Sequence, residues 1–350
     1  MTQRLSAMEL LRPLTAFAVA LSLHAAATAT AEDAAIAVSI QEPWSGVFGG
    51  KEAVFHVTVT ARERAAGRVA WEFSSAGHTI ARGEREVAVG PARPETVEVR
   101  LAVPPVKDDV VMPAALAAAF QGPAGAAAAS AARPVWIFAE NAFADRRQRL
   151  KDMGIRLFDP QGKTAETFTD AGVPFDAVRS VDAFESAYGA VLVIGEGVSF
   201  EENRGLWEAM LRAAAADTTV VCLAPAAGAL PMPGMGGEGL PRPSRVAFRQ
   251  RDVIGELDKR LDSAGWPADG QVVCSTLKPG SVRGTVVAEI AVGDLGWPWV
   301  EWGFGQRGRV VVCGFGIVRQ WKAGPAPRYL LRRMFEVIED NAGSGKQKGK

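Results

Sequence analysis

Short runs in which apolar and polar residues alternate fill the chain between Ala35 and Pro134. Alternation with a period of two places successive side chains on opposite faces and is typical of a half-buried β-strand. Glycine and proline pairs, such as Gly49-Gly50 and Gly90-Pro91, separate the runs as turn residues do. The pattern predicts strands with the sequences AIAVSIQ, EAVFHVTVT, GRVAWEF and ETVEVRLAV.

Several short strands at this spacing predict a β-sandwich of the immunoglobulin-like or fibronectin-like type over residues 32–133. His56 lies on the polar face of its strand and is expected to be solvated rather than a ligand. The alanine-rich run 114–132 has helical propensity, but turn residues at 121–125 interrupt it. We expect a closing hairpin of two strands there; a short helix or a flexible linker is the alternative.

After Pro134 the pattern changes to continuous apolar runs, which are typical of strands buried on both faces of a parallel sheet. The longest is AVLVIGEG from Ala190, and a helical pattern over about 200–216 joins it to TTVVCLAP. A further helix is expected at 142–153. Further strands are expected in WIFAEN, IRLFD, VVAEIAVG, PWVEWGFG and GRVVVCGFG.

A closing amphipathic helix is expected at about 326–340. Strands that alternate with helices in this way predict an α/β domain over residues 134–341, doubly wound and with a mostly parallel sheet. The polar residues 342–350 are expected to form a disordered tail.

The order of these elements resembles the class I glutamine amidotransferase-like fold, in particular its non-catalytic versions found beside sugar-acting enzymes. The segments that carry the resemblance lie within residues 134–340 and read VLVIGEGVSFEENRGLWEAML, TTVVCLAP and GRVVVCGFGIVRQWKAGPAPRYLLRRMFEVI. The resemblance implies a flavodoxin-like sheet. In catalytic members a nucleophilic cysteine sits in a tight turn where a strand meets a helix, with a histidine and an acid supplied later. Here the turn is Leu223–Ala226, Cys222 is expected inside the strand, and no histidine follows, which implies a catalytically silent domain.

Histidine is scarce, since His24, His56 and His78 are the only ones and all precede the midpoint. A cysteine or serine nucleophile at neutral pH normally needs a neighbouring base, most often imidazole. The α/β domain is therefore not expected to hold a Cys-His or Ser-His catalytic site, although a site with lysine or a carboxylate as the base is still an alternative. No His, Cys and carboxylate cluster has metal-ligand spacing. We predict no catalytic residue, no cofactor and no metal.

Composition and charge narrow the class of protein further. The chain has 350 residues, more than one hydrophobic core usually organises, so two domains are expected. Lys+Arg and Asp+Glu each number 39, which removes the positive surplus that non-specific nucleic-acid binding requires. Nucleic acid is therefore not an expected partner.

Residues 1–31 have the three parts of a secretory signal peptide. Two arginines precede an apolar stretch from Leu14 to Ala26, and the small residues Ala29–Ala31 come directly before an acidic pair. We expect cleavage after Ala31, with an uncleaved anchor as the alternative. The apolar stretch is shorter than the ~20 residues that span a bilayer, so the mature chain is expected to be secreted or periplasmic and not membrane-spanning.

The cysteines are Cys222, Cys274 and Cys313, an odd number that one chain cannot pair completely. Each lies in an apolar context, which is typical of buried thiols on strands. A disulfide between Cys222 and Cys313 on neighbouring strands is the alternative in an oxidising compartment.

In open α/β sheets, ligands collect beyond the carboxyl ends of the strands. Glu196 lies there between two glycines and could accept hydrogen bonds from a polyol. The alternative is a structural turn whose acidic residues complement a helix N-terminus. The loop 224–243 shows neither helical nor strand periodicity and is expected to be a lid or a mobile insertion.

Tryptophans supply a second candidate site. Trp297, Trp299 and Trp302 fall in a stretch of six residues with Glu301 between them. Aromatic rings beside charged groups suit a sugar, whose apolar faces stack while its hydroxyls meet charges. The alternative is that the rings pack in a core, which aromatic residues often dominate. The exposure of the rings distinguishes the two interpretations.

These observations favour a secreted, non-enzymatic binding or assembly protein linked to carbohydrate metabolism. The carbohydrate link comes only from the family resemblance and the tryptophans. A hydrolase that acts on glycans through Glu196 and Glu301 is one alternative, and a structural subunit of a cell-envelope assembly is another. The expected partner is a saccharide or an envelope protein.

Overall fold

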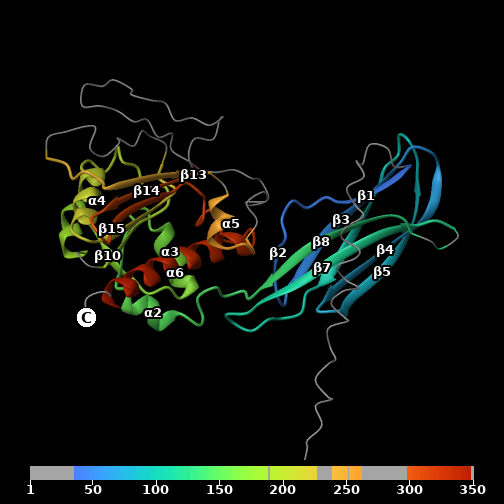
Figure 1. Ribbon diagram of the computed structural model, residues 1–350, viewed down its shortest axis with the longest axis horizontal. Coiled ribbons are helices and arrows are strands. Elements are labelled where there is room, and N and C mark those ends of the chain that lie inside the picture. Colours follow the sequence, from blue (N-terminus) through green and yellow to red (C-terminus); the bar gives the residue numbers. More distant parts are fainter. Residues whose placement is uncertain are drawn as a thin grey trace, which may run out of the picture.

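The computed structural model describes residues 35–123, 125, 127–187, 190–226, 239–250, 252–261 and 298–347. This part of the chain is rich in β-strand and forms several sheets. Figure 1 shows two parts side by side along the long axis, one built of strands and one in which helices cover a sheet. The signal peptide predicted at 1–31 and the strand predicted in VVAEIAVG lie outside the described residues.

Two sheets pack around a shared core in the first part. The smaller sheet has the order β1-β3-β6, with strands at Ile36–Ile40, Glu52–Ala61 and Glu95–Ala102. The larger has the order β2-β8-β7-β4-β5, with strands at Gly46–Phe48, Ala127–Phe138, Val111–Gln121, Ala65–Ser75 and His78–Val89. The four sequences predicted as strands lie in β1, β3, β4 and β6, and their alternate apolar residues, such as Phe55 and Val57, are fully buried.

The alanine-rich segment forms the predicted hairpin rather than a helix. Strands β7 and β8 pair antiparallel, and β7 also pairs with β4 on its other side. Leu116, Ala118 and Phe120 alternate with more open residues and are buried in the shared core. Backbone pairing on both edges and burial of this face outweigh the helical propensity of alanine, because differences in propensity are small beside tertiary contacts.

The boundary between the two parts lies later than predicted. WIFAEN was expected to begin the α/β domain at residue 134, but β8 runs without a break to Phe138. Ile137 is buried in the core of the first part, whereas Phe138 packs in the core of the second. The Phe138 and Tyr329 rings lie 4.6 Å apart, and the Tyr329 hydroxyl donates to the Ala139 carbonyl. One strand therefore serves both cores, and the prediction of a boundary at 133/134 is wrong.

The sheet of the second part has the order β10-β9-β11-β12-β15-β14-β13. The first five strands of this order pair parallel, whereas β14 and β13 pair antiparallel at one edge. In the same order, the strands are Asp176–Val178, Ile155–Phe158, Val191–Ile194, Thr219–Leu223, Gly308–Cys313, Trp299–Phe304 and Arg245–Arg249.

Helices cover both faces of this sheet. On one face lie α2, α3, α5 and α6, at Arg147–Asp152, Lys163–Ala171, Val253–Leu257 and Pro325–Gln347. On the other lie the 3-10 helix η1 and helix α4, at Val181–Ala187 and Leu206–Ala215. Within the described ranges, no helix is both long and apolar enough to cross a bilayer.

Two predicted helices begin later than expected. Gly205 has a left-handed conformation with φ 78° and directly precedes α4, so the helix starts at Leu206 instead of near residue 200. Helix α2 starts at Arg147, because the Asn141 side chain accepts a hydrogen bond from the Phe143 N–H and holds the preceding segment in a turn.

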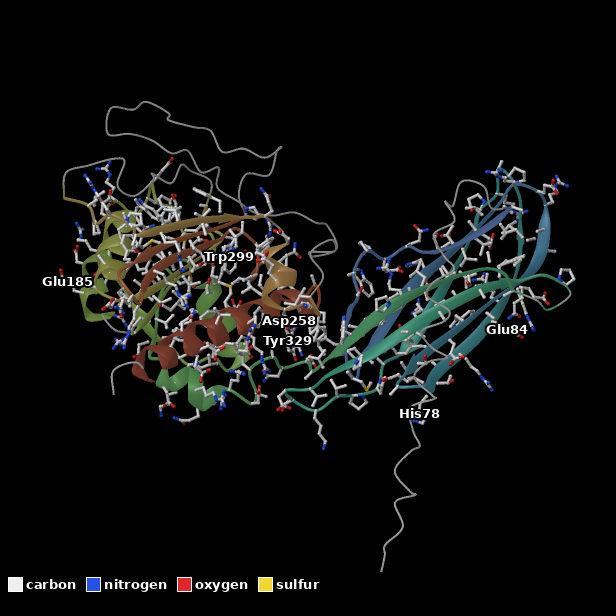
Figure 2. The ribbon with its side chains drawn as sticks, viewed as in Figure 1. His78, Glu84, Glu185, Asp258, Trp299 and Tyr329 are labelled. Atoms are coloured by element: carbon white, nitrogen blue, oxygen red, sulfur yellow. The ribbon has the colours of Figure 1, made fainter. Side chains whose placement is uncertain are left out.

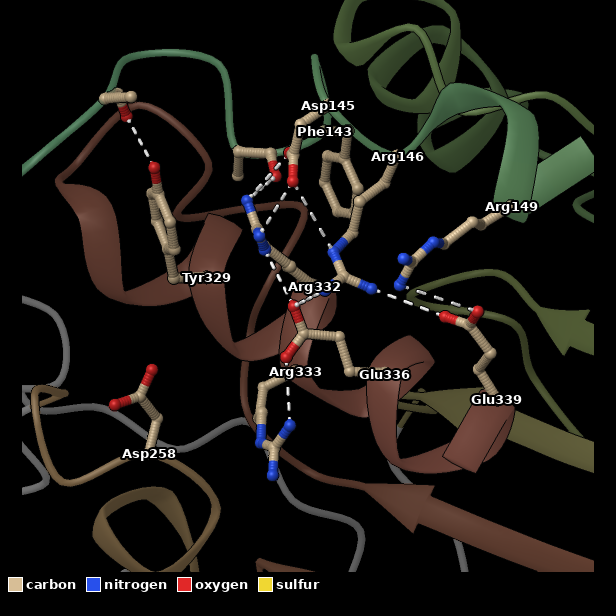
Figure 3. Close-up of polar contacts among 12 residues, drawn as sticks. Phe143, Asp145, Arg146, Arg149, Asp258, Tyr329, Arg332, Arg333, Glu336 and Glu339 are labelled. Carbon is tan, nitrogen blue, oxygen red and sulfur yellow. Dashed lines mark hydrogen bonds and ion pairs between the residues drawn. The ribbon is translucent and has the colours of Figure 1, made fainter. Parts of the chain in front are cut away.

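Helix α6 is anchored to the segment before α2 by a network of charges (Figure 3). Glu336 pairs with Arg146 and Arg332, each at 2.9 Å, and Arg332 also reaches Asp145 at 3.0 Å. Burial acts to raise the pKa of Glu336, but hydrogen bonds from Arg332 and Arg333 and the charge of Arg146 outweigh it, so the pKa is lowered. The network fixes the closing helix against the sheet.

The predicted tail at 342–350 is wrong for most of its length, because α6 continues to Gln347. Gly343 and Gly345, which lie in this end of the helix, cost roughly 1 kcal/mol each in helical propensity, which weakens a helix end without forbidding it. Residues 348–350 lie outside the described part of the chain.

Candidate functional site

The strand order draws attention to the carboxyl ends of β9 and β11. Chain order runs outward from β9 to β10 on one side and from β11 to β12 on the other. The crevice between such strands is where open α/β sheets bind ligands. Phe158 pairs with Ile194 at the last register position, so Asp159 and Gly195 follow their strands side by side.

Glu196 lies at this edge as predicted, but its carboxylate is already occupied. One oxygen accepts the Val318 N–H at 2.6 Å and the other accepts the Arg319 N–H at 3.1 Å. Its own N–H donates to the Thr164 hydroxyl at 2.9 Å. Burial raises the pKa of Glu196, although the two backbone hydrogen bonds act in the opposite direction. Glu196 therefore links the turn after β11 to the turn after β15. This role is structural, but the N–H groups belong to a turn and not to the helix N-terminus of the structural alternative.

Asp159 is the residue at this edge that sequence reasoning missed. Its Oδ2 accepts the Ala165 N–H at 2.9 Å, while its buried Oδ1 has no hydrogen-bond partner among the described residues. A Cβ added to Gly195 would lie 2.7 Å from that Oδ1, so glycine keeps the space beside it open. Asp159 directly follows the buried strand IRLF. This position at the carboxyl end of a predicted strand is the signal in the sequence that could have identified it.

Cys222 lies inside β12, as the sequence predicts, and its side chain is fully buried. Burial raises the pKa of its thiol strongly, because the thiolate would lose its solvation. The residue at the strand tip is Ala224, with φ 22° and no chemical group beyond a methyl. The edge therefore presents no thiol or hydroxyl from this strand as a nucleophile.

The disulfide named as an alternative does not form. Cys222 pairs in register with Val312, so Cys313 lies one residue further along β15 and points to the opposite face of the sheet. Cys222 packs in one core of the second part and Cys313 in the other. Cys274 lies outside the described residues.

Trp299 and Trp302 do not lie on a surface where they could bind a sugar. Trp299 and Trp302 are 3% and 0% exposed and lie in the cores on opposite faces of the sheet, as residues three apart on a strand must. Figure 2 shows Trp299 inside the second part. Trp302 meets Trp207 edge-on, with ring centroids 5.2 Å apart. Packing explains both rings, and Trp297 lies outside the described residues.

Glu196 and Glu301, proposed above as a glycosidase pair, lie in or next to strands that are far apart in the sheet. Glu196 follows β11 and Glu301 lies within β14, and these two strands are three positions apart in the sheet. Three spacings of about 4.8 Å exceed the 5 to 9.5 Å or so between paired catalytic carboxyls. Glu301 also accepts the Trp299 indole N–H at 2.7 Å. Both observations speak against a hydrolase built on these two residues, which stays a prediction.

Neither a metal site nor the whole of the predicted loop is seen at this edge in the described part of the chain. Across the described residues, no three His, Cys, Asp or Glu side chains group in a way that could hold a metal ion. Of the loop predicted at 224–243, residues 227–238 lie outside the described part, so its assignment as a lid or insertion stays a prediction.

The sequence matches no protein-family model and no curated protein. Among solved structures, the sporulation control protein Spo0M from Bacillus subtilis is 11% identical, with a TM-score of 0.24 over 34% of this chain and 55% of that one. A cycloisomaltooligosaccharide glucanotransferase from Paenibacillus sp. is 12% identical, with a TM-score of 0.25 over 53% of this chain and 27% of that one. The chain thus spans about half of these proteins or less, and neither similarity assigns a family.

Proposed function

We propose that this chain is a secreted, non-enzymatic binding or assembly protein, in which an immunoglobulin-like sandwich leads into a catalytically silent amidotransferase-like domain. The observation that carries the proposal is the carboxyl edge of the second sheet. There Cys222 is buried within its strand, Ala224 stands at the strand tip, and Glu196 is held by backbone N–H groups. The sequence beyond His78 holds no imidazole that could activate a nucleophile.

The order of the parallel strands supports the amidotransferase-like, flavodoxin-like part of the proposal. Numbered along the chain within this domain, β10-β9-β11-β12 is the order 2-1-3-4 with which flavodoxin-like sheets begin. Helices on both faces agree with double winding. The antiparallel pair β13 and β14 at the far edge departs from the simplest form of that sheet.

Secretion and a saccharide partner depend on the sequence alone. The signal-like residues 1–31 support the first, and the family resemblance supports the second, since Trp299 and Trp302 are buried. An envelope-assembly role would be favoured by an extensive apolar surface. Among the described residues, Val110 and Val246 are the exposed large hydrophobic side chains, so no such surface supports that alternative.

A turnover assay tests the proposal. The mature chain is incubated with glutamine, with a chromogenic ester and with a chromogenic glycoside, and we expect no hydrolysis above the buffer rate. Cys222→Ser and Asp159→Asn serve as paired variants, because they change the buried thiol of β12 and the carboxylate whose Oδ1 has no partner among the described residues. Turnover that either variant abolishes, while circular dichroism shows an intact fold, would contradict an inert edge.

A further inference from the structure

A cavity of about 710 Å³ opens at the amino ends of the parallel strands, opposite the edge that holds Glu196. One row of residues in register across five strands forms its floor. In order from β11 to β13, this row is Val191, Thr219, Arg309, Gly303 and Arg245. Cross-strand neighbours in register point to the same face of a sheet, so both arginine side chains rise from the same floor.

Gly303 gives the two arginines a shared open space. Gly303 on β14 pairs with Arg245 on β13 and with Arg309 on β15. Because β13 and β15 lie on either side of β14, they are two strand spacings, or about 9.6 Å, apart. A Cβ added to Gly303 would lie 3.6 Å from Nε and 3.9 Å from Nη2 of Arg245. The Arg245 guanidinium therefore lies over the glycine, on the side of Arg309.

Among the described residues, neither of these two arginines has a direct acidic partner, although Glu301 is near enough for its charge to act on Arg309. Within the described part of the chain, no hydrogen bond or ion pair reaches the guanidinium of Arg245 or Arg309. Burial lowers the pKa of Arg309, Glu301 opposes this, and the neighbouring charge of Arg245 adds to the lowering. Two like charges in a partly buried cavity are unfavourable unless an anion lies between them.

The acids that line the cavity are mostly engaged elsewhere. Glu339 pairs with Arg146 at 3.3 Å and lies 3.8 Å from Arg149, and Asp152 accepts a hydrogen bond from Gln148. Asp217 also lines the cavity, at a point where the chain turns with φ 62°. The arginines of the floor thus keep an excess of positive charge.

We propose that Arg245 and Arg309 bind a tetrahedral oxyanion, the phosphate or sulfate group of a small molecule, in this cavity. Guanidinium groups present paired N–H donors that match the oxygens of such a group. The cavity volume falls within the roughly 300–1,000 Å³ of small-molecule sites, so the anionic group is expected to carry an organic part such as a sugar. This site lies at the amino edge of the sheet, whereas the proposed function rests on the carboxyl edge. A failure of one proposal would therefore leave the other unchanged.

Isothermal titration calorimetry of the mature chain tests this site with inorganic phosphate, inorganic sulfate and glucose 6-phosphate as separate probes at low salt. We expect glucose 6-phosphate to bind more tightly than either free ion and all binding to weaken as salt rises. Arg245→Met and Arg309→Met should each weaken binding at least about tenfold. Arg85→Met, on the exposed face of β5, is the matched control and should leave binding unchanged.

Gly303→Glu is a second variant, which tests the site even if Arg309→Met disturbs the fold. Gly303→Glu places a carboxylate between the two guanidinium groups, where it should displace the ligand and pair with both arginines. We expect this variant to fold and to lose binding. A stronger response to phosphate than to sulfate would indicate a phosphomonoester ligand, and an equal response any tetrahedral oxyanion. Absence of binding at millimolar probe, or binding that survives both Arg245→Met and Gly303→Glu, would overturn the site.

Discussion

Replacing Trp302 by alanine should lower the free energy of unfolding by about 3–5 kcal/mol, because it leaves a large cavity in a closed core. The ring is fully buried and meets Trp207 edge-on, next to the apolar side of α4. Urea unfolding of the variant and the parent at one temperature measures the difference. The loss should leave any saccharide affinity unchanged per folded molecule.

Trp302→Phe is the matched control for this experiment. The Trp302 indole N–H is buried and has no partner among the described residues, so phenylalanine removes no hydrogen bond. Its cost should stay near 1–2 kcal/mol, the usual range for a change of shape in a core. If Trp302→Ala keeps the parent stability and instead abolishes binding of a sugar, the packing interpretation of this tryptophan is wrong.

Replacing Glu196 by alanine should destabilise the protein by about 2 kcal/mol, because the N–H groups of Val318 and Arg319 lose their acceptor. Glu196→Gln keeps an acceptor oxygen and should cost less. Glu185, which is exposed on η1, supplies the control Glu185→Gln, which should change stability by less than about 0.5 kcal/mol.

The pH dependence of the Glu196 effect has a defined sign. Because the pKa of Glu196 is raised above its ordinary value of 4.5, the folded state holds its proton more tightly than the unfolded state does. The stability that this proton contributes is complete below pH 4.5 and is lost as pH rises through the raised pKa. The advantage of the parent over Glu196→Gln should therefore shrink from pH 4 to pH 7, and an advantage that grows over this range would contradict the assignment.

Much of the fold follows from local patterns in the sequence. The period of two in EAVFHVTVT and the continuous apolar runs around Val191–Ile194 and Thr219–Leu223 predict strands that the structure contains. The sequence misplaces the boundary because Pro134 resembles a break, although Val135 and Ile137 continue the alternation of β8 and are buried in the first core. Proline inside a strand restricts pairing without ending it.

The candidate sites were less predictable, for a reason of geometry. Trp299 and Trp302 are three residues apart, so the strand period alone sends their rings to opposite faces and argues against a joint surface. The cavity over Gly303 depends on the register of strands that are distant along the chain, with Arg245 and Arg309 brought together by β14 between them. No local spacing in the sequence predicts that Arg245 and Arg309 lie on the two neighbouring strands of β14.

Alkylation of Cys222 tests the inert carboxyl edge most directly. The folded chain is treated with iodoacetamide at neutral pH, and peptide mass spectrometry reports the modification of each cysteine separately. Because Cys222 is fully buried and its pKa is raised by that burial, we predict that it stays unmodified until urea unfolds the protein. Alkylation of Cys222 in the folded chain, faster than that of glutathione under the same conditions, would reveal an activated thiol and contradict the account.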